Sequence, residues 1–267
     1  MLRNTNDLLD YAIQAADGTI GHVKDLYFDD HTWVVRYLVV DAGSWLSSRK
    51  VLISPIAVTQ PDWQEKQLRV SMTREQVRNS PDIDTNKPVS RQHEEAYLTY
   101  YNYPYYWGGT GLWGGGMVPG MMIPGIGGLL DTPPGRLRET DETHAQARAT
   151  VRAQGDPHLR SYNEVAGYHI HASDGDIGHV QGLLVDEQSW AIRYMVVDTS
   201  NWWIGHKVLI VPQWIQDVSW SESKVSVDVT RQAVQDAPPY QPEVQFDRNR
   251  EADIYKHYKR VGYWDGM

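Results

Sequence analysis

Short apolar stretches separated by turn residues run through the first part of the chain. β-Branched and aromatic residues dominate these stretches, while Gly, Asp and Pro fall between them, which is typical of strands and turns. We predict strands over Leu8–Ala15, Ile20–Phe28, Trp33–Asp41, Lys50–Ile53, Ile56–Thr59 and Lys66–Met72. Strands this short and this closely spaced favour a small barrel or a sandwich over parallel β-α-β units.

Two helical segments follow these strands. Thr73 is a typical N-cap residue for a short helical turn that Pro81 ends. Farther on, the segment Gln92–Tyr101 predicts a helix. We expect the aromatic pair Tyr106-Trp107 behind it to fasten this helical tail to its own strands.

The strand predicted at Trp33–Asp41 is apolar on both faces except at Arg36. Alternation of side chains puts Tyr37 on one face, and Arg36 with Leu38 on the other. An outer face exposed to water would be polar, so we expect the face that carries Arg36 and Leu38 to be covered. A covered guanidinium group needs an anion, and we expect a salt bridge between strands or between barrels.

The whole pattern returns 157 residues later in the chain. Asp17–Val23 recurs as Asp174–Val180, and Arg36-Tyr37 recurs as Arg193-Tyr194. Aligning residues 6–108 with residues 163–265 gives about 36 identities in 103 positions, far above chance. We therefore predict an internal duplication, with Asn249–Tyr258 as the second helical tail.

The repeat predicts a mainly β protein in three parts. Residues 1–108 form the first repeat with its tail, residues 109–162 form a Gly/Trp/Met-rich insert and linker, and residues 163–267 form the second repeat with its tail. We expect the two small β-barrels to pack as a pseudo-twofold pair, so that each covers the apolar face of the other. Covering by the helical tail alone is the alternative. The candidate interface residues are Arg36, Leu38, Arg193 and Met195.

Composition excludes several classes of function. The 267 residues include no Cys, which excludes disulfides, thiol catalysis and zinc–thiolate sites. A net charge of −9 argues against binding to nucleic acid through its phosphate backbone. The first residues lack the apolar run of a signal peptide, so we expect a cytoplasmic protein, peripheral to the membrane at most.

Two stretches of the sequence resemble the PRC-barrel domain. The first runs through Asp17-Gly18-x-Ile20-Gly21-x-Val23, Trp33-x-x-Arg36-Tyr37-x-Val39-Val40-Asp41 and Lys50-Val51-Leu52-Ile53-x-Pro55, and the same pattern returns between Asp174 and Pro212. The tail that ends in Gly262-Tyr263-Trp264 looks like that of bacterial stand-alone members. The resemblance implies small β-barrels that serve mainly in protein interaction or assembly, without a common catalytic centre or cofactor.

The chain departs from two well-known members of that family. The photosynthetic reaction-centre H subunit carries a transmembrane helix before its barrel, and no such segment precedes Leu8. The ribosome maturation factor RimM carries an RNA-related N-terminal domain that we do not find here. We therefore predict a non-enzymatic scaffold or adaptor with a protein partner. The alternatives are an accessory subunit of a membrane-associated electron-transfer complex and a small-ligand-binding barrel.

The insert carries a nucleotide-binding motif in form only. Gly109–Gly114 matches G-x-G-x-x-G, but the glycines and Pro119 behind it leave no place for the helix that a pyrophosphate site needs. We predict a Gly-rich loop. Its apolar side chains Trp113, Met121 and Met122 suggest three alternatives, namely a loop folded over the barrels, a partner-binding segment or a membrane contact. A polar helix or a disordered stretch is expected over Arg136–Arg152.

The remaining titratable groups favour structural roles. His169 and His171 have a spacing that can ligate a metal ion, but we favour a half-exposed strand face, because the first repeat has Ala12 and Gln14 at the equivalent positions. His22 and His179 follow a turn glycine, and we expect them to be hydrogen-bonded structural residues. The acidic pairs Asp29-Asp30 and Asp186-Glu187 fit hairpin turns better than acid–base or Ca²⁺ sites. We predict no catalytic, cofactor or metal residue, and homo-oligomer formation stays open.

Overall fold

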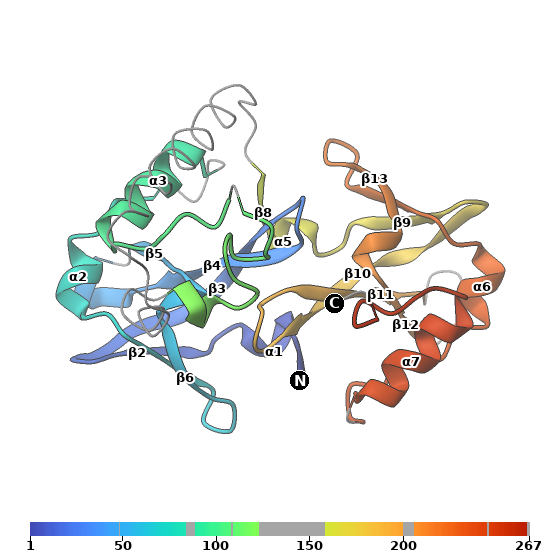
Figure 1. Cartoon of the computed structure of the whole chain (residues 1–267), viewed down its shortest axis with the longest axis horizontal. Coiled ribbons are helices and arrows are strands. Elements are labelled where there is room, and N and C mark those ends of the chain that lie inside the picture. Colours follow the sequence, from blue (N-terminus) through green and yellow to red (C-terminus); the bar gives the residue numbers. More distant parts are fainter. Residues whose placement is uncertain are drawn as a thin grey trace, which may run out of the picture. The chain divides into compact units, whose positions relative to one another are not determined.

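The computed structural model describes residues 1–47, 49–83, 89–107, 109–122, 158–199, 206–244 and 246–265. The chain divides into two compact units, each built around a mainly antiparallel sheet (Figure 1). Unit 1 comprises Met1–Asn6, Tyr162–Glu187 and Ile192–Met267, and unit 2 comprises Asp7–Ser161 and Gln188–Ala191.

The sheet of unit 2 is built from the strands of the first repeat. Its order is β5-β4-β3-β2-β7-β6, and all neighbours are antiparallel except β2 and β7. A seventh strand, β8 (Leu159–Ser161), pairs with β3 outside this path. The bounds of the six strands are β2 (Ala12–Ala15), β3 (Gly18–Asp29), β4 (Val34–Asp41), β5 (Lys50–Ile53), β6 (Val58–Asp62) and β7 (Gln67–Val70).

The sheet of unit 1 has the same order in the second repeat, β12-β11-β10-β9-β14-β13. Here the seventh strand is β1 (Leu2–Asn4), which pairs with β10. Its other strands are β9 (His169–Ala172), β10 (Gly175–Asp186), β11 (Ile192–Asp198), β12 (Lys207–Ile210), β13 (Ile215–Ser219) and β14 (Lys224–Val227).

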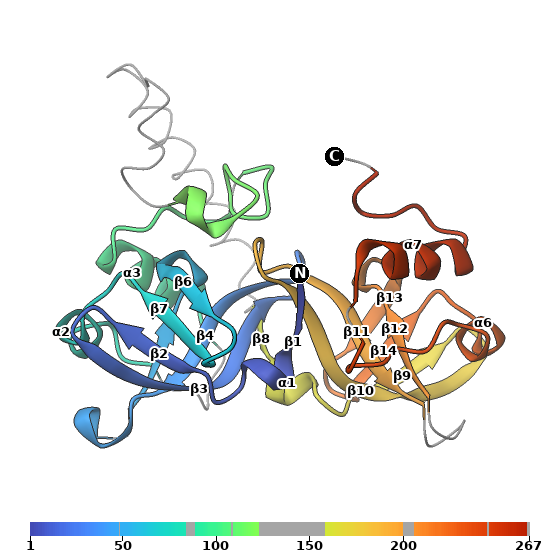
Figure 2. The ribbon, with the colours of Figure 1, turned by 90° about the horizontal axis from the view of Figure 1, so that it is seen from below.

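Helices are short, and side chains cap several of them. Thr73 and Gln76 form a capping box at the start of α2 (Arg74–Arg78), and Thr230 caps α6 (Arg231–Gln235). The two tails form α3 (Arg91–Tyr100), capped by Ser90, and α7 (Arg248–His257), capped by Asp247, and Figure 2 shows each lying on one side of its own sheet. The remaining helical turns are α1 (Thr5–Leu8), α5 (Tyr162–Val165) and the 3-10 turns η1 (Gly43–Leu46), η2 (Pro55–Ala57), η3 (Pro119–Met122) and η5 (Pro212–Trp214).

Most of the predicted elements are confirmed, and two strand starts are wrong. The strand predicted from Leu8 begins at Ala12, because Thr5–Leu8 forms a helical turn and Asp10 adopts a left-handed backbone with φ 66°. The strand predicted from Ile56 begins at Val58, after the 3-10 turn that Pro55 opens.

Three predictions about the fold have different outcomes. A mainly β protein with two sheets is confirmed. No ladder joins β5 to β6 or β12 to β13 in the described parts of the chain, so closure into barrels is not detected. The pseudo-twofold packing of the repeats stays a prediction. The segment Arg136–Arg152, expected to be a polar helix or a disordered stretch, lies outside the described residues.

The units also divide the chain differently from the predicted boundaries. Residues 1–6, assigned above to the first repeat, belong to unit 1 together with the second repeat. The strand β8, assigned to the insert, belongs to unit 2 with the first repeat. Each unit is therefore completed by a strand that precedes the other repeat in sequence.

A β-bulge interrupts the alternation of β4 at Arg36. Tyr27 pairs with Tyr37 and the next residue, Phe28, pairs with Val35, which leaves Arg36 as the extra residue. A bulge turns neighbouring side chains toward the same face. The prediction that Arg36 and Tyr37 lie on opposite faces is therefore wrong, because a period of two does not allow for the extra residue.

Gly21 is required because the backbone of β3 passes very close to the end of β4. A Cβ at this position would lie 1.9 Å from the carbonyl oxygen of Asp41. The same distance at Gly178, measured to Asp198, is 2.0 Å. The Ile-Gly-His-Val sequence of both repeats thus has a steric cause at its glycine.

Candidate functional site

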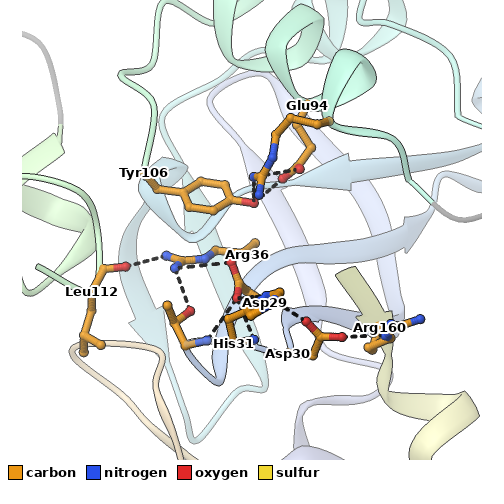
Figure 3. Close-up of polar contacts among 10 residues, drawn as sticks. Asp29, Asp30, His31, Arg36, Glu94, Tyr106, Leu112 and Arg160 are labelled. Atoms are coloured by element: carbon orange, nitrogen blue, oxygen red, sulfur yellow. Dashed lines mark hydrogen bonds and ion pairs between the residues drawn. The ribbon is translucent and has the colours of Figure 1, made fainter. Parts of the chain in front are cut away.

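The candidate site is centred on Arg36, which is buried in unit 2 (Figure 3). One guanidinium nitrogen donates to the carbonyl oxygen of Leu112 at 2.7 Å, and the other donates to Thr32 Oγ1 at 3.0 Å. The carboxylate of Asp29, on the neighbouring strand, lies 4.0 Å away. The expected salt bridge between strands is therefore present, at the outer limit of distance.

Aromatic rings cover the guanidinium group of Arg36. Its central carbon lies 4.0 Å from the centre of the Tyr106 ring and 4.8 Å from that of Trp113. Trp113 is itself fully buried and donates its indole N–H to the carbonyl oxygen of Ser189 at 2.8 Å. Arg36 thereby joins the sheet, the tail and the Gly-rich loop through cation–π contacts and hydrogen bonds.

A second polar group lies beside this stack, on helix α3. Arg91 pairs with Glu94 at 3.0 Å and donates to the hydroxyl of Tyr106 at 2.9 Å. Tyr106 in turn donates a short hydrogen bond to Glu94. Tyr37 extends the group, because its ring packs edge-on against Tyr97 of α3 at 5.1 Å. The predicted fastening of the tail by Tyr106 is confirmed.

Burial shifts the titration of these groups. It raises the pKa of Glu94 to about 7, against the lowering effect of Arg91 and of the hydrogen bond from Tyr106. Burial, reinforced by the nearby Glu94, raises the pKa of Tyr106 well above its ordinary value. Burial also lowers the pKa of Arg36, although Tyr106 and Asp29 oppose that effect.

The acidic turn next to Arg36 brings together Asp29, Asp30 and His31 within distances that a metal ion could bridge. Its charges are already paired, however. Asp29 faces Arg36, and Asp30 forms an ion pair with Arg160 of β8 at 2.7 Å. Asp29 also accepts the backbone N–H groups of His31 and Thr32, each at 3.0 Å. These contacts agree with the turn role predicted for the pair.

Unit 1 contains the same cluster. Arg193 lies 4.1 Å from the centre of the Tyr263 ring, and Tyr263 donates to Glu251 at 2.9 Å. Arg248 pairs with Glu251 at 2.9 Å, and Tyr194 donates to the same carboxylate at 3.1 Å. Each residue stands 157 positions after its counterpart, as in 263 − 106 and 251 − 94.

The two clusters differ in depth. Arg36 is 1% exposed and lies beneath Trp113, whereas Arg193 is half-buried. In both clusters the second arginine stacks on the tail tryptophan, at 4.3 Å for Arg91 on Trp107 and 4.4 Å for Arg248 on Trp264. The insert therefore adds a layer to the cluster of unit 2.

The other predicted interface residues are divided between core and surface. Leu38 and Met195 are fully buried. Trp113 is fully buried and Met122 is 8% exposed, so neither side chain forms a free surface, because both pack against unit 2. Of the apolar insert residues, Met121 is 65% exposed and Met117 is 42% exposed.

The Gly-rich segment is a loop, as predicted. Gly111 pairs with Gly114 and Trp113 pairs with Gly116 in isolated bridges, and a 3-10 turn follows at Pro119–Met122. A Cβ at Gly109 would lie 2.3 Å from the carbonyl oxygen of Gly114, so close backbone contact explains the glycines. Of the three alternatives given for the insert, a loop folded over its own unit is the one that fits the residues from Gly109 to Met122.

The histidines occupy strand faces. His169 is exposed, and His171 forms a 2.7 Å contact with Asp176 on the adjacent strand. His22 is exposed and His179 is half-buried, and the hydrogen-bonded structural role predicted for both stays a prediction. A contact between a histidine ring and a backbone carbonyl is found at His257, whose ring contacts the carbonyl oxygen of Ala233.

Sequence reasoning missed Arg91 and Glu94 as members of the cluster around Arg36. A signal for them was present, because both residues recur at the common offset, as Arg248 and Glu251. An Arg and a Glu three positions apart on a helix face one another. Their recurrence in both tails could have marked them as part of the site.

Comparison with known proteins identifies the fold of the first repeat. The family model of the PRC-barrel domain matches residues 3–76. Residues 3–76 are a PRC-barrel domain. The matched range contains β2 to β7 and ends inside α2, so the tail helix α3 and the insert lie outside it. No curated protein matches the sequence of the chain.

The cluster of unit 2 holds the sheet, the tail and the loop of that unit together. Its ionisable groups come from the sheet and the tail and are buried or partly buried, and the loop contributes the carbonyl oxygen of Leu112 and the ring of Trp113. Two surface grooves lie elsewhere, one beside α7 next to Pro238–Gln241 and one beside α3 next to Pro81. The residues that line these grooves do not include those of either cluster.

Proposed function

We propose that this PRC-barrel protein is a non-enzymatic assembly module that presents a short apolar surface to a protein partner. The observation that carries the proposal is the anchoring of the Gly-rich loop. Arg36 holds the carbonyl of Leu112 and Trp113 is buried, while Met117 and Met121 of the same loop remain exposed. Flexible thioether side chains adapt readily to a partner surface.

The arrangement supports an assembly role for a physical reason. A binding segment that is already fixed loses less conformational entropy when a partner docks. The contacts of Arg36, Trp113 and Met122 fix this loop before any partner arrives. The PRC-barrel domain in residues 3–76 supports the same class of function, because the resemblance to that family implies a module of protein interaction or assembly.

Affinity capture with point variants tests this proposal. We expect M117S/M121S to lose specific partners that the unaltered protein captures. Val261→Ser is the matched control, because Val261 is 78% exposed but lies in the other unit. Deletion of the whole loop is unsuitable, since it would also remove the buried Trp113. Retention of every partner by M117S/M121S would argue against this surface.

The finer proposal is that the protein consists of two PRC-barrel domains that arose by duplication. It is supported by about 36 identities in 103 aligned positions, by the shared strand order and by the two equivalent clusters. The family model covers the first copy alone.

A membrane-associated accessory role is the second candidate. The exposed Met117 and Met121 favour contact with an apolar phase. Among the described residues, no helix is long and apolar enough to cross a membrane. Flotation with phosphatidylcholine/phosphatidylglycerol vesicles separates the candidates. If the unaltered protein floats with the vesicles and M117S/M121S does not, membrane contact through these two residues is supported. If the unaltered protein stays at the bottom of the gradient, membrane contact is excluded.

A further inference from the structure

The two seventh strands point to a mode of self-association. Strand β1 completes the sheet of unit 1, although it precedes the first repeat in sequence. Strand β8 completes the sheet of unit 2, although it precedes the second repeat. The chain therefore already exchanges one strand between its two repeats, in both directions (Figure 2).

The two strand sites are equivalent in register. Leu2 pairs with Asp186, and Leu159 pairs with Asp29. Both differences, 159 − 2 and 186 − 29, equal 157, the offset of the repeat. Each site also receives one backbone bond just before the strand, from Glu187 N to Met1 O at 3.0 Å and from Asp30 N to His158 O at 2.9 Å.

An ion pair secures each strand at the same place. Arg3 contacts Glu187 at 2.5 Å, and Arg160 contacts Asp30 at 2.7 Å. All four side chains are partly buried, with exposed fractions between 11% and 28%. Each pairing thus involves a Leu-Arg sequence in the added strand and an acidic residue that directly follows the accepting strand.

The third position of each strand differs, and the accepting strand differs with it. Asn4 lies over Gly182, where a Cβ would come within 2.8 Å of its side-chain oxygen. Ser161 instead donates to Asp25, the counterpart of Gly182, at 2.5 Å. The larger Asn faces a glycine and the smaller Ser faces a carboxylate. Each strand is therefore matched to its own site.

From these observations we propose that the edge of β10 at Leu184–Asp186 and the edge of β3 at Tyr27–Asp29 are binding sites for a second copy of this chain. In the assembled form, Leu2–Asn4 of one copy occupies the β10 edge of the other copy, and Leu159–Ser161 occupies the β3 edge in the same way. The contacts within each site are those of the single chain, so the exchange of strands creates no new interface and loses none.

The energetics make this exchange accessible. Each added strand is three residues long and is held by three paired residues and one ion pair. Short edge elements of this kind open at a small fraction of the global unfolding free energy. Within one chain, the strand has a high effective concentration at its site, and this favours the single-chain form. The assembled form is therefore expected at high protein concentration or after refolding at such a concentration.

Disulfide trapping tests the proposal, because the chain contains no Cys. Alternation of the antiparallel ladder next to the Glu187–Met1 bond makes Leu2 and Asp186 a non-hydrogen-bonded pair, in which the two Cβ atoms lie close. One copy carries Leu2→Cys and a second, size-tagged copy carries Asp186→Cys. The two full-length proteins are refolded together at high concentration and oxidised.

We expect a disulfide-linked heterodimer of the two copies. Leu159→Cys in place of Leu2→Cys should give at least tenfold less of it, because Ser161 does not match Gly182. Thr59→Cys, exposed on β6, should give none. Absence of the Leu2–Asp186 heterodimer overturns the proposal, and an equal yield from Leu159→Cys overturns the matching of strand to site.

A single chain that carries L2C/D186C controls for geometry. It should form an internal disulfide, and failure to do so would contradict the pairing of β1 with β10 on which the proposal depends. The inference extends the proposed assembly function to self-association, but it stands on different residues. The trapping experiment uses purified protein alone, so its failure leaves the capture experiment with Met117 and Met121 unaffected.

Discussion

Glu94 carries the clearest consequence at the scale of a single residue. Burial raises its pKa from 4.5 to about 7, so the folded protein binds a proton more tightly than the unfolded chain does. Its contribution to stability is fully present below pH 4.5 and is lost as the pH rises through about 7. The two values correspond to about 3 kcal/mol in the free energy of unfolding.

Glu94→Gln tests this dependence. We expect the unaltered protein to lose up to about 3 kcal/mol of unfolding free energy between pH 4.5 and pH 7 through this group, and the variant to lose much less. Denaturant titrations at several pH values measure the difference. Glu95→Gln removes the same charge from the next helix position and should keep the original slope. Equal slopes for Glu94→Gln and the unaltered protein would contradict the role of Glu94.

Arg36 and Arg193 provide a matched pair at the same scale. Lys cannot hold Leu112 and Thr32 together while lying flat on Tyr106, because its ammonium group is a compact point charge. We expect Arg36→Lys to lower the free energy of unfolding by about 2–4 kcal/mol. Arg193→Lys should cost clearly less, since Arg193 is half-buried. Similar losses for both variants would mean that depth of burial does not decide the effect.

Gly21 tests the steric argument about the close passage of β3 and β4. Gly21→Ala would place a methyl group 1.9 Å from the carbonyl oxygen of Asp41, and backbone atoms must move to admit it. We expect a loss of at least about 3 kcal/mol in the free energy of unfolding. Gly115→Ala is the control, because no atom lies within 4 Å of the added Cβ. Thermal and denaturant unfolding of both variants provide the measurement.

At the scale of elements, the loop from Gly109 to Met122 depends on one anchor. Trp113→Ala removes an indole that is fully buried and bonded to Ser189, which should cost about 3–5 kcal/mol. Hydrogen exchange at the amides of Gly111 and Gly116 should speed up at the same time. Met121→Ala, on the same loop but 65% exposed, should change stability by less than about 0.5 kcal/mol. Slow exchange in Trp113→Ala would mean that other contacts hold the loop.

The elements that sequence reasoning predicted are those with a strong local signal. The bounds of β5 at Lys50–Ile53 agree to the residue, because Pro55 and the apolar run define them. The short cap at Thr73 and the tail helix at Arg91–Tyr100 were likewise predictable from local chemistry. These signals depend on neighbours in sequence, which a single chain displays directly.

The features that were not predicted depend on partners distant in sequence. Leu2–Asn4 is too short to show a period, and the residues of β10 that it pairs with are at least 180 positions away. The bulge at Arg36 breaks the period of two that the prediction assumed. The contact of Arg36 with Leu112 joins a strand to a loop without any sequence pattern. The cluster could therefore be predicted in its residue types, through the repeat, but not in its geometry.

At the scale of the whole molecule, the exchanged strands mean that the position of a residue in the sequence does not by itself tell which unit contains it. A substitution near the start of the chain acts on the unit that contains the second repeat. Arg3→Pro removes a backbone donor opposite Val185 and the ion pair with Glu187, both in unit 1. Arg160→Pro removes the equivalent contacts opposite Phe28 and with Asp30, both in unit 2.

These two variants form a reciprocal test of the topology. Arg3→Pro should lower the local stability of β10 and β11 by about 2–3 kcal/mol and leave β3 and β4 unchanged, and Arg160→Pro should do the opposite. Hydrogen exchange with mass spectrometry reads both sheets in one experiment. If each strand belonged to the repeat that follows it in sequence, Arg3→Pro would weaken β3 instead. That result would remove the strand exchange and, with it, the structural basis for self-association through these edges.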